Sequence, residues 1–492
     1  MTRLSGRHGR MRGVAGILVA GTSSDAGKSL MVAGLCRAFV RHGVRVVPFK
    51  AQNMSNNSMV CSDGSEIGRA QYLQALAAGA APSSVMNPVL LKPASDQTAF
   101  IVLRGQPDRI LRAGEYTNGR RQLAQAAFDA YQELAASYDV VVAEGAGSPA
   151  EINLRAGDYV NFGLARRFGL PVLLVGDIDR GGVLASIFGH WAIVDDADRS
   201  TLAGYLINKF RGDRVVLDPG LRELTARTGL PCLGVVPWLD HVWLDGEDAL
   251  AFGNWPRPAG RAGTLRVAVI RFPRISNATD VDALADEPDV EVYATVNPAD
   301  VESADLVVLP GSRATVADLG WLRRLGLAEA LARRAGAGGP ILGICGGYEM
   351  LTTVIDDPVE SGQESVAGLG LLPGRVSFRR EKVLGRPVGG WDGHSVVGYE
   401  IHHGVVDAVD GEPFLGGIRV GNTWGTMWHG VFENDGFRRS WLSQIAATVS
   451  SGWQPQPGVP GFAERRTGML DALADAIETH TDLPAILALA GG

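Results

Sequence analysis

The sequence predicts an α/β protein with two domains, each built on a mostly parallel sheet. Short apolar strands alternate with amphipathic helical segments, a glycine-rich loop follows the first strand, and a second α/β rhythm starts after a Pro- and Gly-rich stretch. A chain of 492 residues is also too long for one core. We expect a domain at 1–253, a linker at 254–263, a domain at 264–450 and a helical extension at 451–492.

Composition narrows the class of protein. Apolar residues make up 46% and charged residues 20% of the chain, which is ordinary for a globular protein. A net charge of −7 gives no reason to expect nucleic acid as a partner. The basic segment 1–13 lacks the apolar stretch of a signal peptide and no run is long enough to span a membrane, so we expect a cytoplasmic protein. No Cys-x-x-Cys spacing occurs, so neither a disulfide framework nor a zinc site is expected among the cysteines, which are Cys36, Cys61, Cys232 and Cys345.

The segment 16–29 predicts a phosphate-binding loop. An apolar strand over 14–20 runs into a glycine-rich turn, and a helix starts at Lys28 and continues to about Arg41. Lys28 is expected to reach the terminal phosphates of ATP, and the Ser29 hydroxyl to hold Mg²⁺. Five residues rather than the usual four separate the two glycines, but a chance glycine-rich loop explains Gly-Lys-Ser between strand and helix less well. The expected ATP-binding backbone comes from Gly21, Thr22, Asp25, Ala26 and Gly27.

A second strand over 44–49 leads into the amide-rich loop 50–58. Ligands of open α/β sheets lie outside the carboxyl ends of strands, so Lys50 and Asn53 are candidate substrate contacts, with a merely solvated loop as the alternative. Asp63 and Glu66 follow. Either could hold a metal, although a helix N-cap and a first-turn acid explain them equally well.

A carboxylate ends the next buried strand. Helical patterns over 66–81 and 119–137 precede a strand at 139–144, which ends in Glu144 followed by Gly-Ala-Gly. A buried glutamate at that point needs a partner, and we favour a second acidic ligand for phosphate-bound Mg²⁺ over a surface acid in a turn.

Three later strands repeat this arrangement and end in polar residues. Asp177 and Asp179 are candidates for positioning substrate or binding metal, and Asn208 for reading the adenine edge through its amide. A single residue of this kind is weak evidence, whereas the series is better. The strands are expected at 171–177, 202–208 and 232–237.

The second domain contains a candidate nucleophile, Cys345. A short strand, the turn Gly-Ile-Cys-Gly-Gly and a helix start form the cysteine counterpart of a nucleophile elbow. We expect the helix N-terminus to lower the pKa of the thiol toward a thiolate, and backbone N–H groups of Gly346 and of the loop containing Gly311 to stabilise an oxyanion. The surrounding elements are expected as strands at 265–270, 290–294 and 305–309 and a helix at 318–334.

A cysteine nucleophile needs a base, and the chain has nine histidines. His429 follows a strand late in this domain and is the preferred candidate. His402 and His403 are its rivals, and the residues alone leave the choice open.

Six segments together resemble one family, the cobyric acid synthases, over nearly the whole chain to about residue 440. The N-terminal half is similar to dethiobiotin synthetase, a P-loop NTPase-like fold that shares the five-residue spacing. The C-terminal half resembles class I glutamine amidotransferases, which implies a flavodoxin-like fold. The segments are 21–29, 49–58, 144–154, 177–182, 207–213 and 273–277.

The resemblance implies an activity. Cys345 would attack the side-chain amide of glutamine with His429 as the proton shuttle. ATP and Mg²⁺, held by Lys28, Ser29 and Glu144, would phosphorylate a corrinoid carboxylate that ammonia then converts to an amide. The implied substrate is adenosylcobyrinic acid a,c-diamide, amidated at its b, d, e and g carboxylates.

One departure and two alternatives accompany this interpretation. Class I amidotransferases carry a Glu two residues after the histidine, whereas position 431 is Val. A Cys–His dyad is therefore expected, with Glu433 or Glu400 as guesses for a residue that orients His429.

The alternatives are a cobyrinic acid a,c-diamide synthase and a MinD-like ATPase switch with an inactive amidase domain. Such switches carry a second lysine early in the loop, where this chain has Thr22, Ser23 and Ser24. A homo-oligomer is left open.

Overall fold

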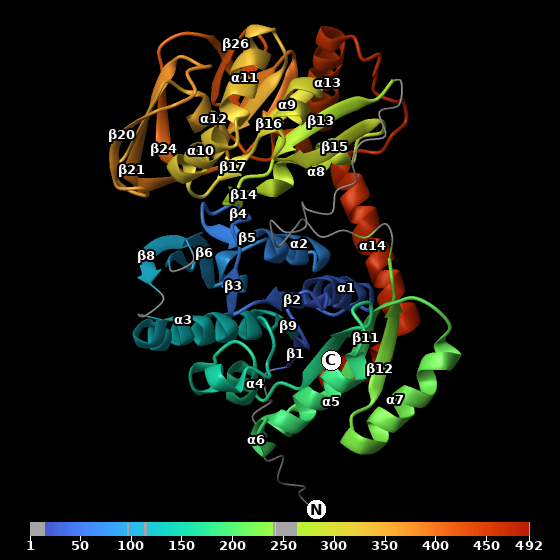
Figure 1. The fold of residues 1–492 in the computed structure, drawn as a ribbon. Helices are drawn as coiled ribbons and strands as arrows, with labels where there is room; N and C mark the ends of the chain where they lie inside the picture. Colours follow the sequence, from blue (N-terminus) through green and yellow to red (C-terminus); the bar gives the residue numbers. More distant parts are fainter. Residues whose placement is uncertain (1–14, 96–97, 113–115, 240–241, 243–262, 492) are drawn as a thin grey trace, which may run out of the picture.

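The computed structural model describes residues 15–95, 98–112, 116–239, 242 and 263–491. The basic segment 1–13 and nearly all of the expected linker 254–263 lie outside these residues. The described chain forms two lobes, with the N-terminal lobe below the C-terminal lobe in Figure 1.

The N-terminal lobe is built on a six-stranded parallel sheet in the order β12-β11-β10-β1-β9-β2. β1 lies at the point where the chain turns from one half of the sheet to the other, which confirms the doubly wound prediction. Its neighbour β9 is in register so that Val19 pairs with Glu144. The strands are β1 (Gly16–Gly21), β2 (Val46–Phe49), β9 (Val140–Glu144), β10 (Val172–Asp177), β11 (Leu202–Phe210) and β12 (Cys232–Pro237).

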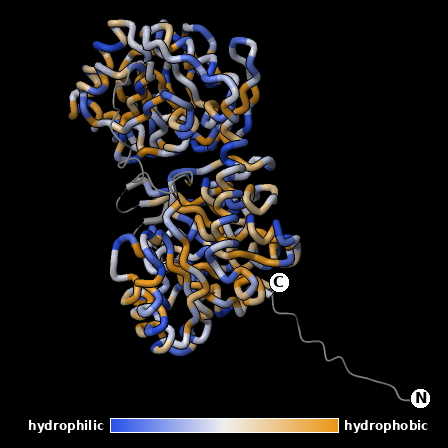
Figure 2. The backbone as a smooth tube through the Cα atoms, turned by 90° about the vertical axis from the view of Figure 1, so that its right-hand side faces the viewer, coloured by the Kyte–Doolittle hydropathy of each residue, from blue (hydrophilic) through white to orange (hydrophobic). Residues whose placement is uncertain are grey.

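Helices cover both faces of this sheet, so its strands are apolar on both sides. Ile17 and Val19 of β1 join a core with α1 on one face, while Leu18 and Ala20 join a second core on the other. Figure 2 shows apolar segments, in orange, running through both lobes. The helices of this lobe are α1 (Lys28–Arg41), α2 (Arg69–Ala77), α3 (Tyr116–Ser137), α4 (Phe162–Phe168), α5 (Val183–Ile193), α6 (Asp196–Arg199) and α7 (Arg214–Thr228).

Two small additions between β2 and α3, one mixed sheet and one antiparallel hairpin, were not predicted. The first is a sheet of β3 (Gln52–Met54), β6 (Val89–Ser95), β7 (Thr98–Leu103) and β8 (Gln106–Arg112). The second is the hairpin of β4 (Ser58–Val60) and β5 (Glu66–Gly68). The helix expected over 66–81 therefore starts three residues later, because Glu66 to Gly68 pair with β4 instead.

The C-terminal lobe contains a seven-stranded sheet in the order β15-β13-β16-β18-β27-β26-β25. The helix expected over 318–334 is two helices, α10 (Thr315–Arg324) and α11 (Leu327–Gly336), separated at Gly326, whose φ is 73°. The strands of the main sheet are β13 (Leu265–Ile270), β15 (Val290–Thr295), β16 (Leu306–Leu309), β18 (Ile341–Ile344), β25 (Glu412–Phe414), β26 (Gly417–Val420) and β27 (Thr423–Thr426).

Smaller elements complete this lobe. A four-stranded sheet, β20-β19-β21-β24, and the hairpin β22–β23 lie between β18 and β25 in the chain. Their bounds are β19 (Val354–Asp357), β20 (Gln363–Ala367), β21 (Gly374–Gly385), β22 (Val388–Trp391), β23 (His394–Val397) and β24 (Glu400–Ala408). The other elements are β14 (Ile275–Ser276), β17 (Gly311–Ser312), α8 (Asp282–Ala285), α9 (Pro298–Ser303), α12 (Gly346–Leu351) and α13 (Asp435–Val449).

The C-terminal segment does not stay with the lobe that precedes it. α14 (Phe462–His480), drawn in red in Figure 1, runs back along the N-terminal lobe and packs on α1, and α15 (Leu483–Leu489) follows it. Leu473 and Ile477 of α14 lie against Gly34 of α1, where a Cβ atom would be 2.7 Å from Ile477. The helical extension predicted at 451–492 thus contributes to the core of the first lobe.

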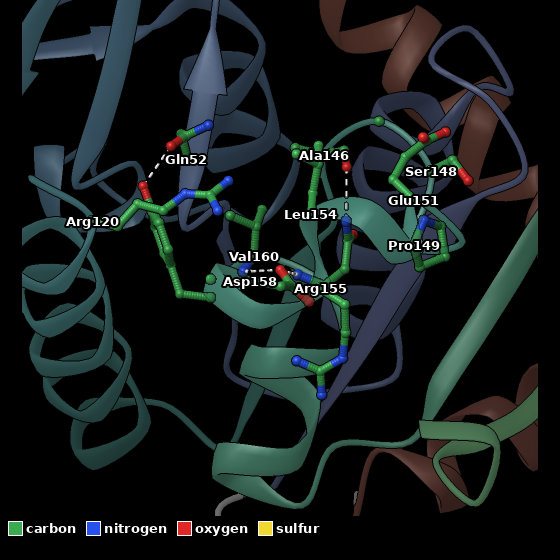
Figure 3. Close-up of a pocket in the computed structure, with 14 residues that line it drawn as sticks. Gln52, Arg120, Ala146, Ser148, Pro149, Glu151, Leu154, Arg155, Asp158 and Val160 are labelled. Atoms are coloured by element: carbon green, nitrogen blue, oxygen red, sulfur yellow. Dashed lines mark hydrogen bonds between the residues drawn. The ribbon is translucent and has the colours of Figure 1, made fainter. Parts of the chain in front are cut away.

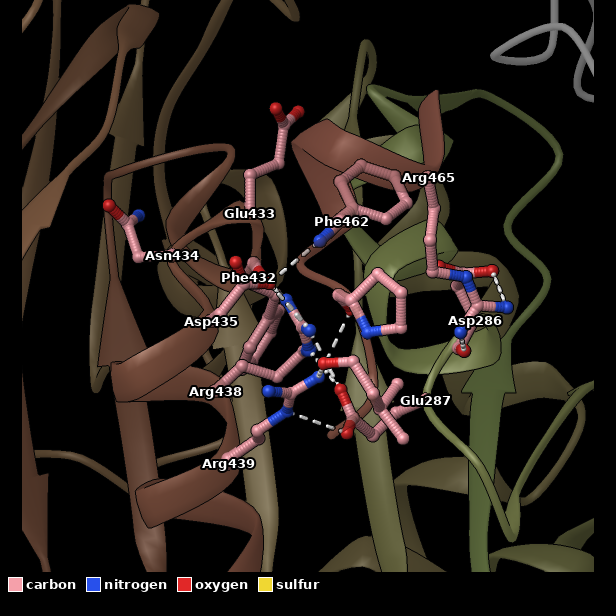
Figure 4. A network of polar contacts seen from close by, with 12 residues as sticks. Asp286, Glu287, Phe432, Glu433, Asn434, Asp435, Arg438, Arg439, Phe462 and Arg465 are labelled. Carbon is pink, nitrogen blue, oxygen red and sulfur yellow. Dashed lines mark hydrogen bonds and ion pairs between the residues drawn. The ribbon is translucent and has the colours of Figure 1, made fainter. Parts of the chain in front are cut away.

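A polar network fixes the start of α14 to the C-terminal lobe (Figure 4). Buried Arg438 of α13 donates to Glu287 at 2.7 and 2.8 Å, and Asp435 accepts a hydrogen bond from the backbone N–H of Phe462 at 2.8 Å. Arg465 is paired with Asp286 at 2.7 Å. α14 is therefore attached to both lobes and holds them together.

Direct contacts also join the two lobes. The Oδ1 atom of Asn277 accepts a hydrogen bond from the Ser58 N–H at 3.0 Å, and Asn57 accepts one from the Ala278 N–H at 3.1 Å. Buried Glu66 of the β4–β5 hairpin is paired with Lys382 of β21 at 2.6 Å. The segments 49–58 and 273–277, which belong to different domains of the sequence, therefore meet at this interface.

Candidate functional site

The predicted phosphate loop connects β1 to α1. Gly27 adopts φ 92°, a left-handed conformation that favours glycine, immediately before the helix. The Lys28 ammonium lies over the loop and donates to the carbonyl oxygens of Ser23 and Ser24, both at 2.8 Å. Strand, turn, lysine and helix start have the arrangement that the sequence predicted.

Asn208 lies against the phosphate loop. Its buried amide donates to the carbonyl oxygen of Ala26 at 2.9 Å, and a Cβ atom on Gly27 would lie 2.2 Å from the amide nitrogen. Asn208 thus braces the loop, and its contact with adenine stays a prediction. Asp25 and Thr22 are held as well, through an ion pair of Asp25 with Arg180 at 2.8 Å and a backbone bond from Thr22 to Val175 at 2.9 Å.

Ser29 and Glu144 meet behind the phosphate loop. The Ser29 hydroxyl donates to Oε1 of Glu144 at 2.8 Å, and Glu144 is fully buried. β1 and β9 are adjacent strands, so their carboxyl ends bring the two residues together as predicted. Two neighbouring ligands of an octahedral Mg²⁺ lie about 3 Å apart, so this oxygen pair fits that ion.

Two further buried side chains contact Glu144. The Lys50 ammonium lies 2.7 Å from Oε1, and Gln74 of α2 donates to Oε2 at 2.6 Å. Lys50, predicted as a substrate contact, thus places a second positive charge beside the phosphate loop. Gln74 was not predicted, because nothing in a helical pattern distinguishes it from other polar positions.

The other predicted substrate and metal residues have hydrogen-bond or ion-pair partners elsewhere. Asp63 accepts hydrogen bonds from Ser65 in the turn of the β4–β5 hairpin, which explains it without a metal. Asn53 donates to Gln71 at 3.0 Å. Asp177 is paired with Lys209 at 2.7 Å, and Asp179 lies 3.9 Å from Arg211.

Cys345 lies in a strained turn at the end of β18. Its φ of 50° and ψ of −113° are unusual for a residue with a side chain, as at a nucleophile elbow. Its N–H donates to the carbonyl oxygen of Thr426 at 2.7 Å on the adjacent strand β27. Because His429 follows Thr426 by three residues, Cys345 and His429 both lie beyond the paired ends of β18 and β27.

His429 is oriented by a residue that the sequence did not reveal. Its Nδ1 atom is 2.6 Å from a carboxylate oxygen of Asp280, and both side chains are buried. Nε2 of His429 is buried without a hydrogen-bond partner among the described residues. The prediction that Glu433 or Glu400 orients His429 is wrong. Glu433 is paired with Arg69, and Glu400 lies 3.7 Å from His402. His429 therefore has a carboxylate partner that the expected dyad did not include.

The rival histidines bond to the backbone. Nδ1 of His402 contacts the carbonyl of Gly404 at 2.7 Å, and that of His403 contacts Arg379 at 3.0 Å. Both line the cavity at Cys345 but have no carboxylate partner as close as Asp280 is to His429.

The predicted oxyanion donors are the N–H groups of Gly346, which follows Cys345, and of Gly311 in β17, and these two segments lie against each other. A Cβ atom on Gly346 would be 2.7 Å from the backbone nitrogen of Ser312, and one on Gly311 would be 3.2 Å from the ring of His429. Gly311 and Ser312 therefore lie against both the turn after Cys345 and His429. This close approach is why glycine is required at both positions.

The cavity beside Cys345 is lined by both lobes. Lys92 of β6 belongs to the N-terminal lobe, and Lys382, Arg313 and Glu360 belong to the C-terminal lobe. Glu349 also lines it; burial raises the pKa of this carboxyl to about 8, and the hydrogen bond from Thr315 opposes that only in part. Charged groups of both lobes thus line the same cavity as the thiol.

The predicted lowering of the thiol pKa is wrong. Burial raises the pKa of Cys345, the nearby Glu349 raises it further, and the hydrogen bond with Gly346 offsets only part of this. The sequence argument counted the helix N-terminus but not the cost of placing a charge in a dry cavity. Deprotonation of this thiol therefore requires a base.

The fold and the two centres define a class of protein: a glutamine amidotransferase domain joined to a P-loop nucleotide-binding domain. Two family models match in the same order, the CobQ/CobB/MinD/ParA nucleotide binding domain over residues 17–250 and the CobB/CobQ-like glutamine amidotransferase domain over residues 266–437. The protein is an enzyme, a glutamine-hydrolysing carbon–nitrogen ligase that uses ATP.

Full-length relatives narrow the class to one family. A cobyric acid synthase of Cutibacterium acnes is 62% identical and aligns with 97% of this chain and 100% of its own length. Cobyric acid synthases of Mycolicibacterium gilvum and Mycobacterium ulcerans are 53% and 54% identical, over 97% and 96% of this chain and of their own lengths. The chain belongs to the cobyric acid synthase family. None of the helices in its described part is long and apolar enough to cross a membrane.

Proposed function

We propose that the chain amidates the b, d, e and g carboxylates of adenosylcobyrinic acid a,c-diamide, with ATP as the activating agent and glutamine as the nitrogen source. The supporting observation is that the wall of the Cys345 cavity includes Lys92 from the nucleotide-binding lobe. Nitrogen released at the thiol is thus released at the boundary with the lobe that activates the acceptor.

The proposed glutamine hydrolysis uses Cys345, His429 and Asp280. The Cys345 sulfur attacks the side-chain amide carbon while its proton passes to Nε2 of His429. Asp280 holds the imidazole in the correct tautomer, and N–H groups of Gly346 and Gly311 stabilise the oxyanion. The C–N bond breaks, the amide nitrogen takes the proton from His429 and leaves as ammonia, and water hydrolyses the thioester to glutamate.

Carboxylate activation takes place at the phosphate loop. A carboxylate oxygen of the corrinoid attacks the γ-phosphorus of ATP, ADP leaves, and an acyl phosphate remains. Lys28 and Lys50 place positive charge where the phosphoryl group accumulates negative charge. Ser29 and Glu144 would hold Mg²⁺, which neutralises phosphate charge when bound. Ammonia then attacks the acyl carbon, the C–O bond to phosphate breaks, and an amide and inorganic phosphate result.

Mass spectrometry of the corrinoid tests this proposal. The purified protein with ATP, Mg²⁺ and glutamine should convert adenosylcobyrinic acid a,c-diamide through four successive replacements of a carboxyl by an amide. If cobyrinic acid is amidated at a and c instead, the protein is a diamide synthase. If ATP is hydrolysed without amidation of either corrinoid, a switch-type ATPase replaces the proposal.

A cysteine variant tests the two-centre scheme. Cys345→Ala should abolish glutamine-driven amidation while ammonium salts still support the reaction, because the phosphate loop is intact. Cys232→Ala, a half-buried cysteine far from the triad in sequence, should keep both activities. Loss of both activities in Cys345→Ala, or of neither, contradicts the scheme.

A further inference from the structure

A second cavity, of about 160 Å³, lies at the carboxyl ends of β9 and β2, and the functions above do not use it. Figure 3 shows its lining, with Arg120 reaching in from α3 on one side and the 146–161 segment on the other. Gln52, two residues beyond Lys50, forms one wall and accepts a hydrogen bond from Tyr159.

The cavity adjoins the phosphate loop. Asn161 lines it and lies against Gly145, where a Cβ atom would be 2.2 Å from Oδ1 of Asn161 and 3.5 Å from the Cα atom of Ala20. Gly145 follows Glu144 directly and Ala20 belongs to β1. Asn161 in the cavity wall therefore lies beside the residue that follows Glu144 and near the strand that leads into the phosphate loop.

Asn161 itself points to a ligand. The side chain is 8% exposed, and its amide nitrogen donates to the Ala146 carbonyl at 2.8 Å. Its Oδ1 atom is buried and has no hydrogen-bond partner among the described residues. A buried amide oxygen without a partner costs free energy unless a donor is supplied, for example by a carboxyl or amide arm of a ligand.

Charged side chains line the cavity. The Asp158 carboxylate accepts backbone N–H bonds from Val160, Asn161 and Gly163 at 2.8 to 2.9 Å. Arg155 is bound by both oxygens of Asp198. Arg120 is packed against Gly157, where a Cβ atom would lie 2.4 Å from its guanidinium. The absence of a side chain at Gly157 thus leaves room for the guanidinium at the cavity wall.

An apolar ledge borders the cavity. Ile152 and Leu154 of the 3₁₀ helix η2 (Ile152–Gly157) are 55% and 49% exposed, and Leu154 also lines the cavity. Two large exposed aliphatic side chains beside a polar pocket suit a ligand that has an apolar body and polar arms.

We propose that this cavity receives a carboxylate arm of the corrinoid, with Arg120 as the carboxylate partner and the Ile152–Leu154 ledge beneath the macrocycle. The inference rests on the proposed function, since it names where that substrate binds. The cavity is too small for the ring, so one arm would enter at a time and come to lie beside the phosphate loop.

Binding measurements on the full chain test it. Arg120→Gln should weaken binding of adenosylcobyrinic acid a,c-diamide by about 10- to 100-fold, the loss expected for a charge-assisted hydrogen bond. Arg120→Lys should recover part of it. Arg121→Gln, the exposed neighbour on α3, is the matched control and should bind as the wild type does. Corrinoid absorbance after equilibrium dialysis measures the binding, and glutamate release and ATP affinity should stay unchanged.

Leu154→Ser is a second, independent variant at a half-exposed position that the fold does not depend on, and it should also weaken corrinoid binding. Unchanged corrinoid binding in both variants, with a wild type that amidates the corrinoid, overturns the inference and leaves the proposed function intact. A change in ATP affinity instead assigns the cavity to the nucleotide. A wild type that amidates no corrinoid contradicts the proposed function itself.

Discussion

Nδ1 of His429 and a carboxylate oxygen of Asp280 are 2.6 Å apart although 149 residues separate them in the chain. The other oxygen of Asp280 accepts the N–H of Gly430 at 2.8 Å, so the carboxylate is fixed on both sides. We propose that it orients His429 in place of the glutamate expected two residues after the histidine, where this chain has Val431. The aspartate is supplied by the 3₁₀ helix η4 (Ala278–Val281) that follows β14, rather than by the histidine's own segment.

Asp280→Asn should lower the rate of glutamine hydrolysis by about 10²- to 10⁴-fold, because an amide at this position can stabilise the wrong imidazole tautomer. Amidation driven by ammonium salts should persist. Glutamate release measures the first activity, and Glu400→Gln is the control, since Glu400 contacts His402 instead. Equal losses in both variants would show that Asp280 has no special relation to His429.

Glu144→Gln should reduce amidation from either nitrogen source by about 100-fold or more, because Ser29 loses its carboxylate partner and Mg²⁺ loses a ligand. The Mg²⁺ concentration needed for half-maximal ADP formation should rise. Asp63→Asn, at the other predicted metal position, should leave that concentration unchanged because Asp63 serves the hairpin turn. A shift in Asp63→Asn without one in Glu144→Gln would reverse this assignment of the metal ligand.

Glutamine hydrolysis should decline above about pH 8 as Glu349 ionises in the cavity. Burial raises the pKa of this carboxyl, so its neutral form predominates below that pH; above it, a negative charge beside Cys345 opposes thiolate formation. Glu349→Gln keeps the position neutral and should remove that limb of the pH–rate profile for glutamate release. The same alkaline limb in Glu349→Gln would assign the decline to another group.

Glu433→Gln should destabilise the protein by roughly 2–3 kcal/mol, because Arg69 and Arg466 lose their shared carboxylate. These two arginines lower the pKa of Glu433 to about 2. The stabilisation is thus complete above the ordinary glutamate pKa and is lost as the pH falls toward 2. Denaturant unfolding at neutral and acid pH should show a smaller acid loss in the variant. An unchanged acid loss would place the effect elsewhere.

Local sequence patterns were enough to locate both candidate reaction centres in the chain. The phosphate loop from Gly21 to Ser29 and the turn around Cys345 are continuous segments, and their chemistry follows from a strand, a turn and a helix start that are adjacent in the chain. The sequence also predicted that Glu144 has a partner near the phosphate loop, because a buried carboxylate at the end of a strand is costly without one. The family followed from the number and order of such segments.

Contacts between segments far apart in the chain could not be predicted from the sequence. Asp280, Gln74 and the contacts of Asn57 with Ala278 and of Asn277 with Ser58 have no periodicity or spacing that marks them. The segment of α14 has only the pattern of an amphipathic helix until its partner α1 is known. The raised pKa of Cys345 likewise depends on how many side chains exclude water from it. The sequence by itself therefore determined which chemistry each lobe performs, since that chemistry resides in continuous motifs. Only the tertiary structure decided how the lobes are joined and which residues orient the catalytic groups, because those depend on packing between segments far apart in the chain.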